Sequence, residues 1–251
     1  MTEFTQNLDQ FSDNGFINLK GFLAPSEVEE LEHHLQQYIH NIVPKLPPTD
    51  AFYEVEGKPE TLKQLQAMGQ HDPFFYSLAE NSKFSALAEK LLDGKVTIKE
   101  SMQFFNKPAR IGKETPPHQD GYYFCLLPSE AVTLWLPLDR IAEENGCIRY
   151  VRGSHKKGIR PHNVSNILGF SQGIADWNEA DDQGEVKVLA EPGDLLAHHC
   201  DIIHRAGANT SPRSRRALAI VFQLASAVED TTALKRYLDS ATQQRLKIQA
   251  K

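Results

Sequence analysis

The chain has 251 residues and a formal net charge of −6, with 40% hydrophobic and 24% charged residues. This composition excludes a wholly disordered chain, and the acidic balance argues against a protein built to bind nucleic-acid phosphates. No apolar run reaches the roughly 20 residues of a membrane span, and the polar start lacks the basic and apolar regions of a signal peptide. We therefore expect a cytoplasmic protein with neither membrane nor nucleic-acid partners, whose cysteines, Cys125, Cys147 and Cys200, stay reduced.

The first 95 residues are predicted to be mainly helical. Apolar residues recur every three or four positions over 26–42, and Ser26 and Glu29 fit a capping box behind Pro25. A second helix is predicted over 83–92, with Gly94 as its C-cap. The proline-rich and charged stretch 44–62 predicts neither a helix nor a strand.

After Lys95 the sequence pattern changes to short runs that are typical of strands. These runs are rich in β-branched and aromatic residues and cover 96–106, 131–138, 146–151, 185–190, 193–199 and 215–225. No helices separate them, so a β-sandwich or barrel is expected rather than a parallel sheet. The tail 231–248 has a helical pattern. We thus expect one domain, 1–251, with a helical front over 1–95, a β core over 96–225 and a C-terminal helix within 226–251.

Two connections stand out between these runs. Asn145-Gly146 is typical of a hairpin turn that joins two strands. The segment 155–184 is long and irregular, which is typical of a functional loop. We expect this segment to be a lid over the site, with four residues as its candidate contacts: Asn163, Asn166, Phe170 and Gln172.

The stretch PPHQDGYYF, residues 116–124, carries the first chemical signal. His118 and Asp120 are two positions apart, and on an extended strand such side chains point to the same face. An imidazole and a carboxylate make up two members of the 2-His-1-carboxylate triad of non-haem Fe(II) oxygenases. Three histidines could supply the missing ligand. His198 and His199 are adjacent, so at most one of them faces the site, whereas His204 ends an apolar run just before small residues.

A basic cluster, SPRSRR, follows at 211–216. Arginine suits the bidentate capture of a carboxylate, and Arg215 lies at the start of the last predicted strand. Strand parity places Arg213 and Arg215 on one face and Arg216 on the other, without deciding which face turns inward. A solvated basic turn is the alternative. Trp135 is expected on a strand that runs through the sheet.

In series, HQDGYYF, WLPLDR…NGCIRYVRGSH and PGDLLAHHCDIIHRAGANTSPRSRRAL resemble the phytanoyl-CoA dioxygenase family of Fe(II)/2-oxoglutarate-dependent oxygenases. The resemblance runs from about Met102 to Leu224. It implies a double-stranded β-helix, or jelly-roll, fold with N-terminal helices. It also implies Fe(II), 2-oxoglutarate and O₂ as cofactor and cosubstrates. The residues implied are iron ligands at His118, Asp120 and His204, a carboxylate-binding arginine at Arg215, and further cosubstrate contacts at Gln103, Trp135 and Lys63.

The implied activity is hydroxylation of a small molecule with release of succinate and CO₂. Related halogenases have a small residue in place of the ligand carboxylate, so Asp120 favours hydroxylation. His199 matches a family histidine that does not bind iron. Ala206 departs from the small polar residue often found there, which puts one hydrogen bond to the cosubstrate in doubt. Two alternatives stay open: a zinc-dependent hydrolase or isomerase using the same ligands, which would not need Arg215, and a non-catalytic metal- or ligand-binding module.

Overall fold

The computed structural model describes residues 3–80, 82–167 and 170–249. The helices are α1 (Glu3–Asn14), α2 (Pro25–Asn41), α3 (Met68–His71), α4 (Pro73–Ala79), α5 (Lys83–Leu91), α6 (Gly121–Phe124), α7 (Glu179–Gln183) and α8 (Thr231–Gln249), with 3₁₀ turns at Val43–Lys45, Pro59–Thr61, Glu143–Asn145 and Ser154–Lys157. The strands are β1 (Phe16–Leu19), β2 (Ala51–Tyr53), β3 (Leu62–Leu65), β4 (Val96–Lys107), β5 (Thr115–His118), β6 (Leu126–Leu127), β7 (Ala131–Pro137), β8 (Ile148–Val151), β9 (His162–Ile167), β10 (Phe170–Ile174), β11 (Glu185–Val188), β12 (Leu195–His199), β13 (His204–Ala206), β14 (Arg215–Leu224) and β15 (Val228–Glu229).

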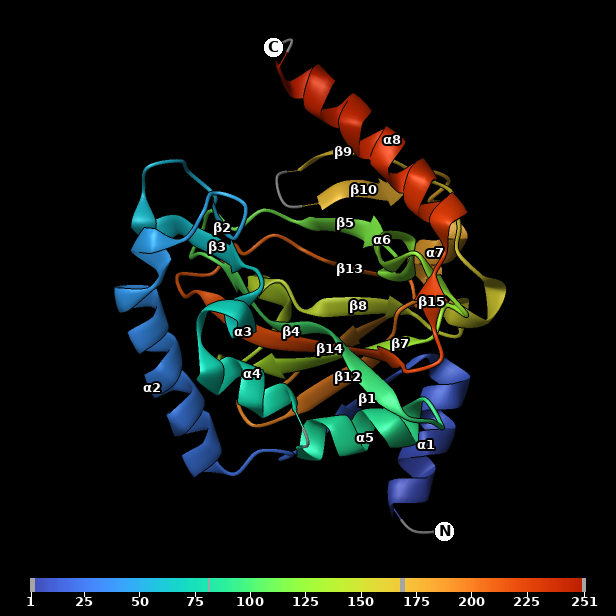
Figure 1. The fold of residues 1–251 in the computed structure, drawn as a ribbon, viewed down its shortest axis with the longest axis horizontal. Coiled ribbons are helices and arrows are strands. Elements are labelled where there is room, and N and C mark those ends of the chain that lie inside the picture. The colour runs from blue at the N-terminus through green and yellow to red at the C-terminus, as the bar shows by residue number, and fades with distance from the viewer. Residues whose placement is uncertain (1–2, 81, 168–169, 250–251) are drawn as a thin grey trace.

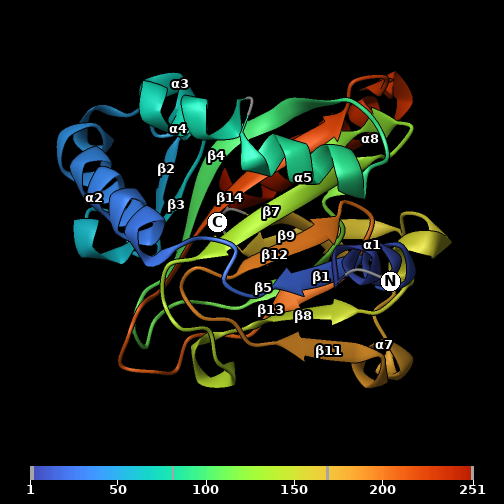
Figure 2. The same cartoon turned by 90° about the horizontal axis from the view of Figure 1, so that it is seen from below.

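Two antiparallel sheets form the centre of the molecule (Figures 1 and 2). The larger has seven strands in the order β1-β12-β7-β14-β4-β3-β2, and the smaller has four in the order β11-β8-β13-β5. Most neighbours in these sheets are distant in the chain, which is the non-local pairing of a jelly roll rather than a meander. Helices α2 to α5 cover the outer face of the large sheet (Figure 2). The predicted jelly-roll sandwich with N-terminal helices in a single domain is confirmed.

Strand alternation divides the interior into two cores. On β7, Leu134 and Leu136 belong to the core under the helices, whereas Trp135 belongs to the core between the two sheets. On β14, Ala217 and Ala219 face that same inner core. The pocket described below lies between the two sheets and is lined by Trp135 of β7 and Arg215 of β14.

The helical front differs from the sequence prediction in two respects. It also contributes β1, β2 and β3 to the large sheet, one of them from the stretch 44–62. The capping box at Ser26 and Glu29 is wrong, because Pro25 already occupies the first helical turn of α2 and Ala24 is the N-cap. The Ala24 N–H donates to the carboxylate of Glu27 at 2.8 Å instead.

The end of α5 lies close to the prediction, but the expected role of Gly94 is wrong. The left-handed residue there is Asp93, with φ of +48°. Gly94 follows it and packs against β14, where a Cβ would approach Leu224 Cδ2 to 2.8 Å.

The hairpin predicted at Asn145-Gly146 is also wrong. The flanking strands β7 and β8 lie in different sheets, so the chain crosses between sheets at this corner. The Asn145 side chain accepts from the Ala142 N–H at 2.8 Å and donates to the Arg140 carbonyl at 2.7 Å, while Gly146 takes a φ of +86°. The side-chain hydrogen bonds of Asn145 and the positive φ of Gly146, which also suit tight hairpins, here stabilise a crossover between the sheets.

The segment 155–184 is not an irregular loop. It contains the antiparallel hairpin β9–β10 and the helix α7. The C-terminal helix α8, predicted over 231–248, lies along this hairpin (Figure 1). Cys125, Cys147 and Cys200 are free and buried, as expected. Within the described ranges, no helix combines the length and the apolar character needed to cross a bilayer.

Candidate active site

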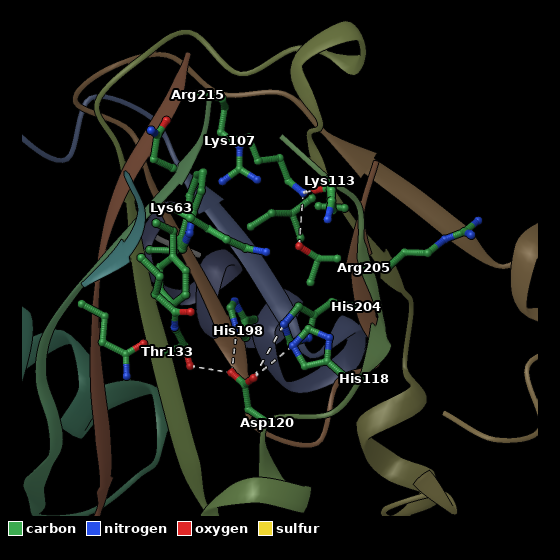
Figure 3. A pocket seen from close by; sticks show the side chains of 18 of the residues that line it. Lys63, Lys107, Lys113, His118, Asp120, Thr133, His198, His204, Arg205 and Arg215 are labelled. Carbon is green, nitrogen blue, oxygen red and sulfur yellow. Dashed lines mark hydrogen bonds and ion pairs between the residues drawn. The ribbon is translucent and has the colours of Figure 1, made fainter. Parts of the chain in front are cut away.

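Two strands of the small sheet bring the predicted metal ligands together. His118 ends β5 and His204 opens β13, and the two residues are directly paired across the antiparallel ladder. Asp120 is not on the strand, as the spacing argument assumed. Its φ of −59° and ψ of −35° are helical, because the chain already turns here into α6. The turn nevertheless directs its carboxylate towards both imidazoles (Figure 3).

The imidazoles present their Nε2 atoms to the carboxylate. Asp120 Oδ1 lies 3.5 Å from His118 Nε2 and 3.8 Å from His204 Nε2. The Nδ1 atom of His118 lies 2.8 Å from the Pro116 carbonyl, and that of His204 lies 3.1 Å from the Ile202 carbonyl. A carbonyl accepts only from a protonated nitrogen, so each Nδ1 carries the proton and each Nε2 keeps its lone pair. One potential ligand atom from each of the three residues lies within 4.8 Å of the others.

The charge states of these groups suit a cation. Burial would raise the pKa of Asp120, but the surrounding imidazoles, His204 foremost, hold the pKa of this carboxyl well below its usual range. Burial and the neighbouring His118 lower the pKa of His204 well below its ordinary value. The site therefore combines an ionised carboxylate with a neutral imidazole, which are the protonation states required for metal binding.

The second oxygen of the carboxylate is held by other groups. Asp120 Oδ2 accepts from Thr133 Oγ1 at 3.0 Å and lies 3.3 Å from His198 Nε2. On its other side, His198 Nδ1 lies 2.9 Å from the Tyr150 hydroxyl. The adjacent His199 turns away and lies 3.2 Å from Glu130. The sequence alone does not decide which of the two histidines faces the site. The pairing of His198 with Thr133 across β12 and β7 decides it, because Thr133 also faces the site.

The remaining predicted residues line the same pocket as the three ligands. Lys63, Gln103, Trp135 and Arg215 all line it, from β3, β4, β7 and β14. Figure 3 shows Lys63 and Arg215 there. Arg215 is only 4% exposed, and its Nε has no hydrogen-bond partner. Its guanidinium carbon lies 5.3 Å from the centre of the Trp135 ring, and burial lowers the pKa of Arg215 to about 10. A buried guanidinium in this state calls for an anionic ligand.

Lys107 is a pocket cation that the sequence reasoning missed. It pairs with Arg215 in the register of β4 and β14, and its ammonium donates to the Lys113 carbonyl and to Thr115 Oγ1. Among the described residues it has no carboxylate within ion-pair distance, whereas Lys63 lies 3.3 Å from Glu54 Oε1. Burial, with Arg215 nearby, lowers the pKa of Lys107 well below its ordinary value. Lys107 lies four positions after Gln103 on β4, and residues at even spacing on a strand share a face, so with Gln103 placed in the pocket the sequence could have predicted that Lys107 faces the pocket.

The three arginines of the basic cluster have separate roles. Arg215 faces the pocket. Arg216 points to the other side of the sheet, where it pairs with Asp139 and with Glu32 of α2. Arg213 is exposed, with its guanidinium 4.0 Å from Glu144. Parity therefore gave the correct separation of Arg215 from Arg216, but the shared face of Arg213 and Arg215 is wrong, because β14 begins only at Arg215.

The hairpin β9–β10 borders the loop that carries the ligands. His162 Nε2 accepts from the Gln119 N–H at 3.2 Å, between the two ligands of that loop, and the His162 ring stacks on Tyr122. The Tyr123 hydroxyl donates to the Gln172 carbonyl at 2.6 Å. The expected movement of this segment as a lid stays a prediction. The side chains of two of its candidate contacts, Asn166 and Phe170, lie outside the described residues.

The chain is similar to known proteins over most of its length. A "Phytanoyl-CoA dioxygenase" of Arabidopsis thaliana is 26% identical over 247 residues, which cover 85% of this chain and 86% of that protein. The crystal structure of EvdO2 from Micromonospora carbonacea var. aurantiaca superposes with a TM-score of 0.72 at 25% identity, over 91% of this chain and 94% of that one. The epimerase SnoN, in complex with Fe3+, alpha ketoglutarate and nogalamycin RO, gives a TM-score of 0.71 at 21% identity, over 91% and 86% of the two chains.

The sequence model of the family described as "Phytanoyl-CoA dioxygenase (PhyH)" matches residues 11–217. That span includes β1 to β13, the start of β14 and every predicted site residue. The match begins well before Met102, where the resemblance was first seen to begin, and ends within β14 before Leu224. The chain belongs to the phytanoyl-CoA dioxygenase family.

Proposed function

We propose that this protein is an Fe(II)- and 2-oxoglutarate-dependent dioxygenase that hydroxylates a small molecule. One observation carries the proposal. Two imidazoles and an ionised carboxylate, each offering one ligand atom, converge in the same pocket as a buried arginine whose Nε has no hydrogen-bond partner. The first group fits a non-haem Fe(II) ion, and the second fits a dicarboxylate cosubstrate.

His118, Asp120 and His204 would hold the iron. Their donor set of two nitrogens and one oxygen is that of the facial triad, which leaves coordination positions for cosubstrate and O₂. The carbonyls of Pro116 and Ile202 fix the ring orientations, so the metal would meet a preformed site. Asp120 also supports hydroxylation over halogenation, because no room is left where a halide would replace the carboxylate.

Arg215 would hold the distal carboxylate of 2-oxoglutarate, with Trp135 packing beside it. Lys63, Gln103 and Lys107 would complete this end of the pocket. Of the two lysines, Lys107 is the better candidate for a second cation on the cosubstrate, because it lies opposite Arg215 and has no carboxylate partner among the described residues. SnoN, whose structure holds Fe3+ and alpha ketoglutarate, shows that the fold accommodates both groups.

Iron bound here would supply the activation of O₂ that is coupled to oxidation of the cosubstrate. The overall reaction would convert a substrate C–H bond, 2-oxoglutarate and O₂ into C–OH, succinate and CO₂. The protein's own contribution is to orient the cosubstrate with Arg215 and to keep water from the reacting atoms with a largely buried pocket. Hydroxylation needs a test of its own, because SnoN, which has the same fold, is an epimerase.

The test is an anaerobic titration of the Fe(II)-loaded protein with 2-oxoglutarate, followed by the visible charge-transfer band of the chelated cosubstrate. We expect the band in the wild type and in Arg213→Ala, and a much weaker band in Arg215→Ala. Arg213 is the matched control because it lies two residues away on the surface. Full iron occupancy without a band would overturn the proposal. In turnover with O₂, a product heavier by one oxygen atom would support hydroxylation, and a product of unchanged mass would contradict it.

A further inference from the structure

We propose that Tyr150 and His198 form a positioning relay that holds Asp120 with one oxygen directed at the metal position. Tyr150 fixes the tautomer of His198, and His198, together with Thr133, occupies the second oxygen of the carboxylate. The inference rests on the proposed function only in naming iron as the metal. The relay itself is a property of the apo protein.

The two oxygens of Asp120 have different surroundings. Oδ1 faces the Nε2 atoms of His118 and His204 at 3.5 and 3.8 Å, and these are the atoms that would bind a metal together with it. Oδ2 faces a hydroxyl donor, Thr133 Oγ1, at 3.0 Å and His198 Nε2 at 3.3 Å. An ionised carboxylate is stabilised by donors and repelled by lone pairs. Oδ2 is thus already satisfied, while Oδ1 is the oxygen that faces the two ligand imidazoles.

The tautomer of His198 follows from its two neighbours. A neutral imidazole donates from one nitrogen and accepts at the other. A lone pair on Nε2 would repel Asp120 Oδ2, so Nε2 carries the proton and Nδ1 accepts from the Tyr150 hydroxyl at 2.9 Å. The relay therefore runs from the Tyr150 O–H through the ring of His198 to Asp120.

The surroundings keep this relay rigid. Tyr150 is fully buried and His198 is 2% exposed. Phe16 of β1 stacks on the Tyr150 ring at a centroid distance of 4.4 Å and an interplanar angle of 14°. The members come from both sheets, with Tyr150 on β8, His198 on β12 and Thr133 on β7. The relay thus connects the two layers of the sandwich at the point where the carboxylate must be held.

The first test reads the tautomer in the apo protein. A ¹H–¹⁵N correlation of the histidine rings should show His198 protonated at Nε2 and unprotonated at Nδ1. In Tyr150→Phe the Nδ1 resonance should shift towards that of an unbonded imidazole nitrogen, because Nδ1 no longer has a donor, while Asp120 keeps the proton on Nε2. A wild-type spectrum with the proton on Nδ1 would overturn the proposal.

The second test measures Fe(II) affinity by anaerobic calorimetry, with Fe(II) alone as the probe. His198→Leu should weaken binding by about 10- to 100-fold, the range seen when a group behind a metal ligand is removed. His198→Gln should restore most of the affinity, because its amide nitrogen can replace Nε2 as the donor to Oδ2. His199→Leu is the matched control, since the neighbouring ring turns away from the site. A folded His198→Leu that binds Fe(II) as tightly as the wild type would contradict the relay.

Thr133→Val provides an independent reading if His198→Leu fails to fold. It removes one donor from Oδ2 without changing the side-chain shape, and the Fe(II) affinity should fall while Thr133→Ser retains it. Equal affinity in Thr133→Val and wild type would also count against the proposal. These outcomes do not depend on 2-oxoglutarate. A wild type that binds Fe(II) without the cosubstrate band would overturn the proposed function and leave the relay intact.

Discussion

Adjacent arginines on β14 should have opposite effects on the stability of the apo protein. Arg215 is 4% exposed, and burial lowers its pKa from 12.5 to about 10. A fall of this size corresponds to roughly 3 kcal/mol of disfavoured charge. Replacing Arg215 by Met removes that cost and gives up a cation–π contact with Trp135 of about 1 kcal/mol. The expected gain is about 2 kcal/mol, or a rise in Tm of about 4–8 °C.

Arg216→Met should act in the opposite direction. The Arg216 guanidinium donates to Asp139 at 2.7 and 3.0 Å and to Glu32 at 2.8 and 2.9 Å. Its side chain is 30% exposed, so solvent screens part of this interaction. Leaving both half-buried carboxylates unpaired should still cost about 2 kcal/mol.

The assay is thermal and urea unfolding of both variants, free of metal and cosubstrate. Saturating Fe(II) and 2-oxoglutarate should then reverse the order of wild type and Arg215→Met, since both gain from Fe(II) but only the wild type gains from the cosubstrate carboxylate on Arg215. If Arg215→Met loses as much stability as Arg216→Met, the guanidinium is satisfied within the fold, and its role as an anion site is refuted.

Three further predictions concern the ligand loop and its neighbours. The pKa of His162 is lowered by burial to about 4, against 6.5 for the free group, so the unfolded chain binds more protons between these values. Stability should therefore fall as the pH drops from 6.5 to 4. Urea unfolding at pH 7 and pH 4.5 should show that His162→Gln loses about 2–3 kcal/mol less stability over this range than the wild type. An equal loss of stability in both proteins would contradict this. Gly121→Ala should destabilise by about 1–3 kcal/mol, because a Cβ there overlaps Asp201 Oδ1, whereas Gly207→Ala, which meets nothing within 4 Å, should be neutral in the same assay. Asp120→Ala should weaken Fe(II) binding at least 100-fold by calorimetry, about as much as or more than His198→Leu, since it removes a ligand rather than the group behind it; retention of wild-type affinity would exclude Asp120 from the site.

The sequence predicted the strands of the core well, because each is bounded by turn residues and made of β-branched and aromatic side chains. β4, β7 and β14 all lie within a residue or so of their expected bounds. The short strands β1, β2 and β3 were missed, since four residues or fewer carry too little periodicity. The hairpin β9–β10 was read as a loop because its sequence, HNVSNI over β9, shows no clear apolar alternation.

Pairing across sheets set the limit on predicting the site. Motif spacing and the family resemblance brought His118, Asp120, His204 and Arg215 to one pocket. The sequence alone could not show that His198 and Lys107 point into the pocket, because the position of each depends on pairing with a partner strand. Which residues face one another, Thr133 with His198 or Arg215 with Lys107, depends on a register between strands that are far apart in the chain.

A crystal structure of the protein, grown anaerobically with Fe(II) and 2-oxoglutarate, would test the central claim most directly. We expect anomalous iron density bounded by His118 Nε2, His204 Nε2 and Asp120 Oδ1, with His198 still bonded to Oδ2. The distal carboxylate of 2-oxoglutarate should lie on the Arg215 guanidinium. Iron bound at another site, or a fully metallated pocket in which Arg215 contacts no cosubstrate, would contradict the account.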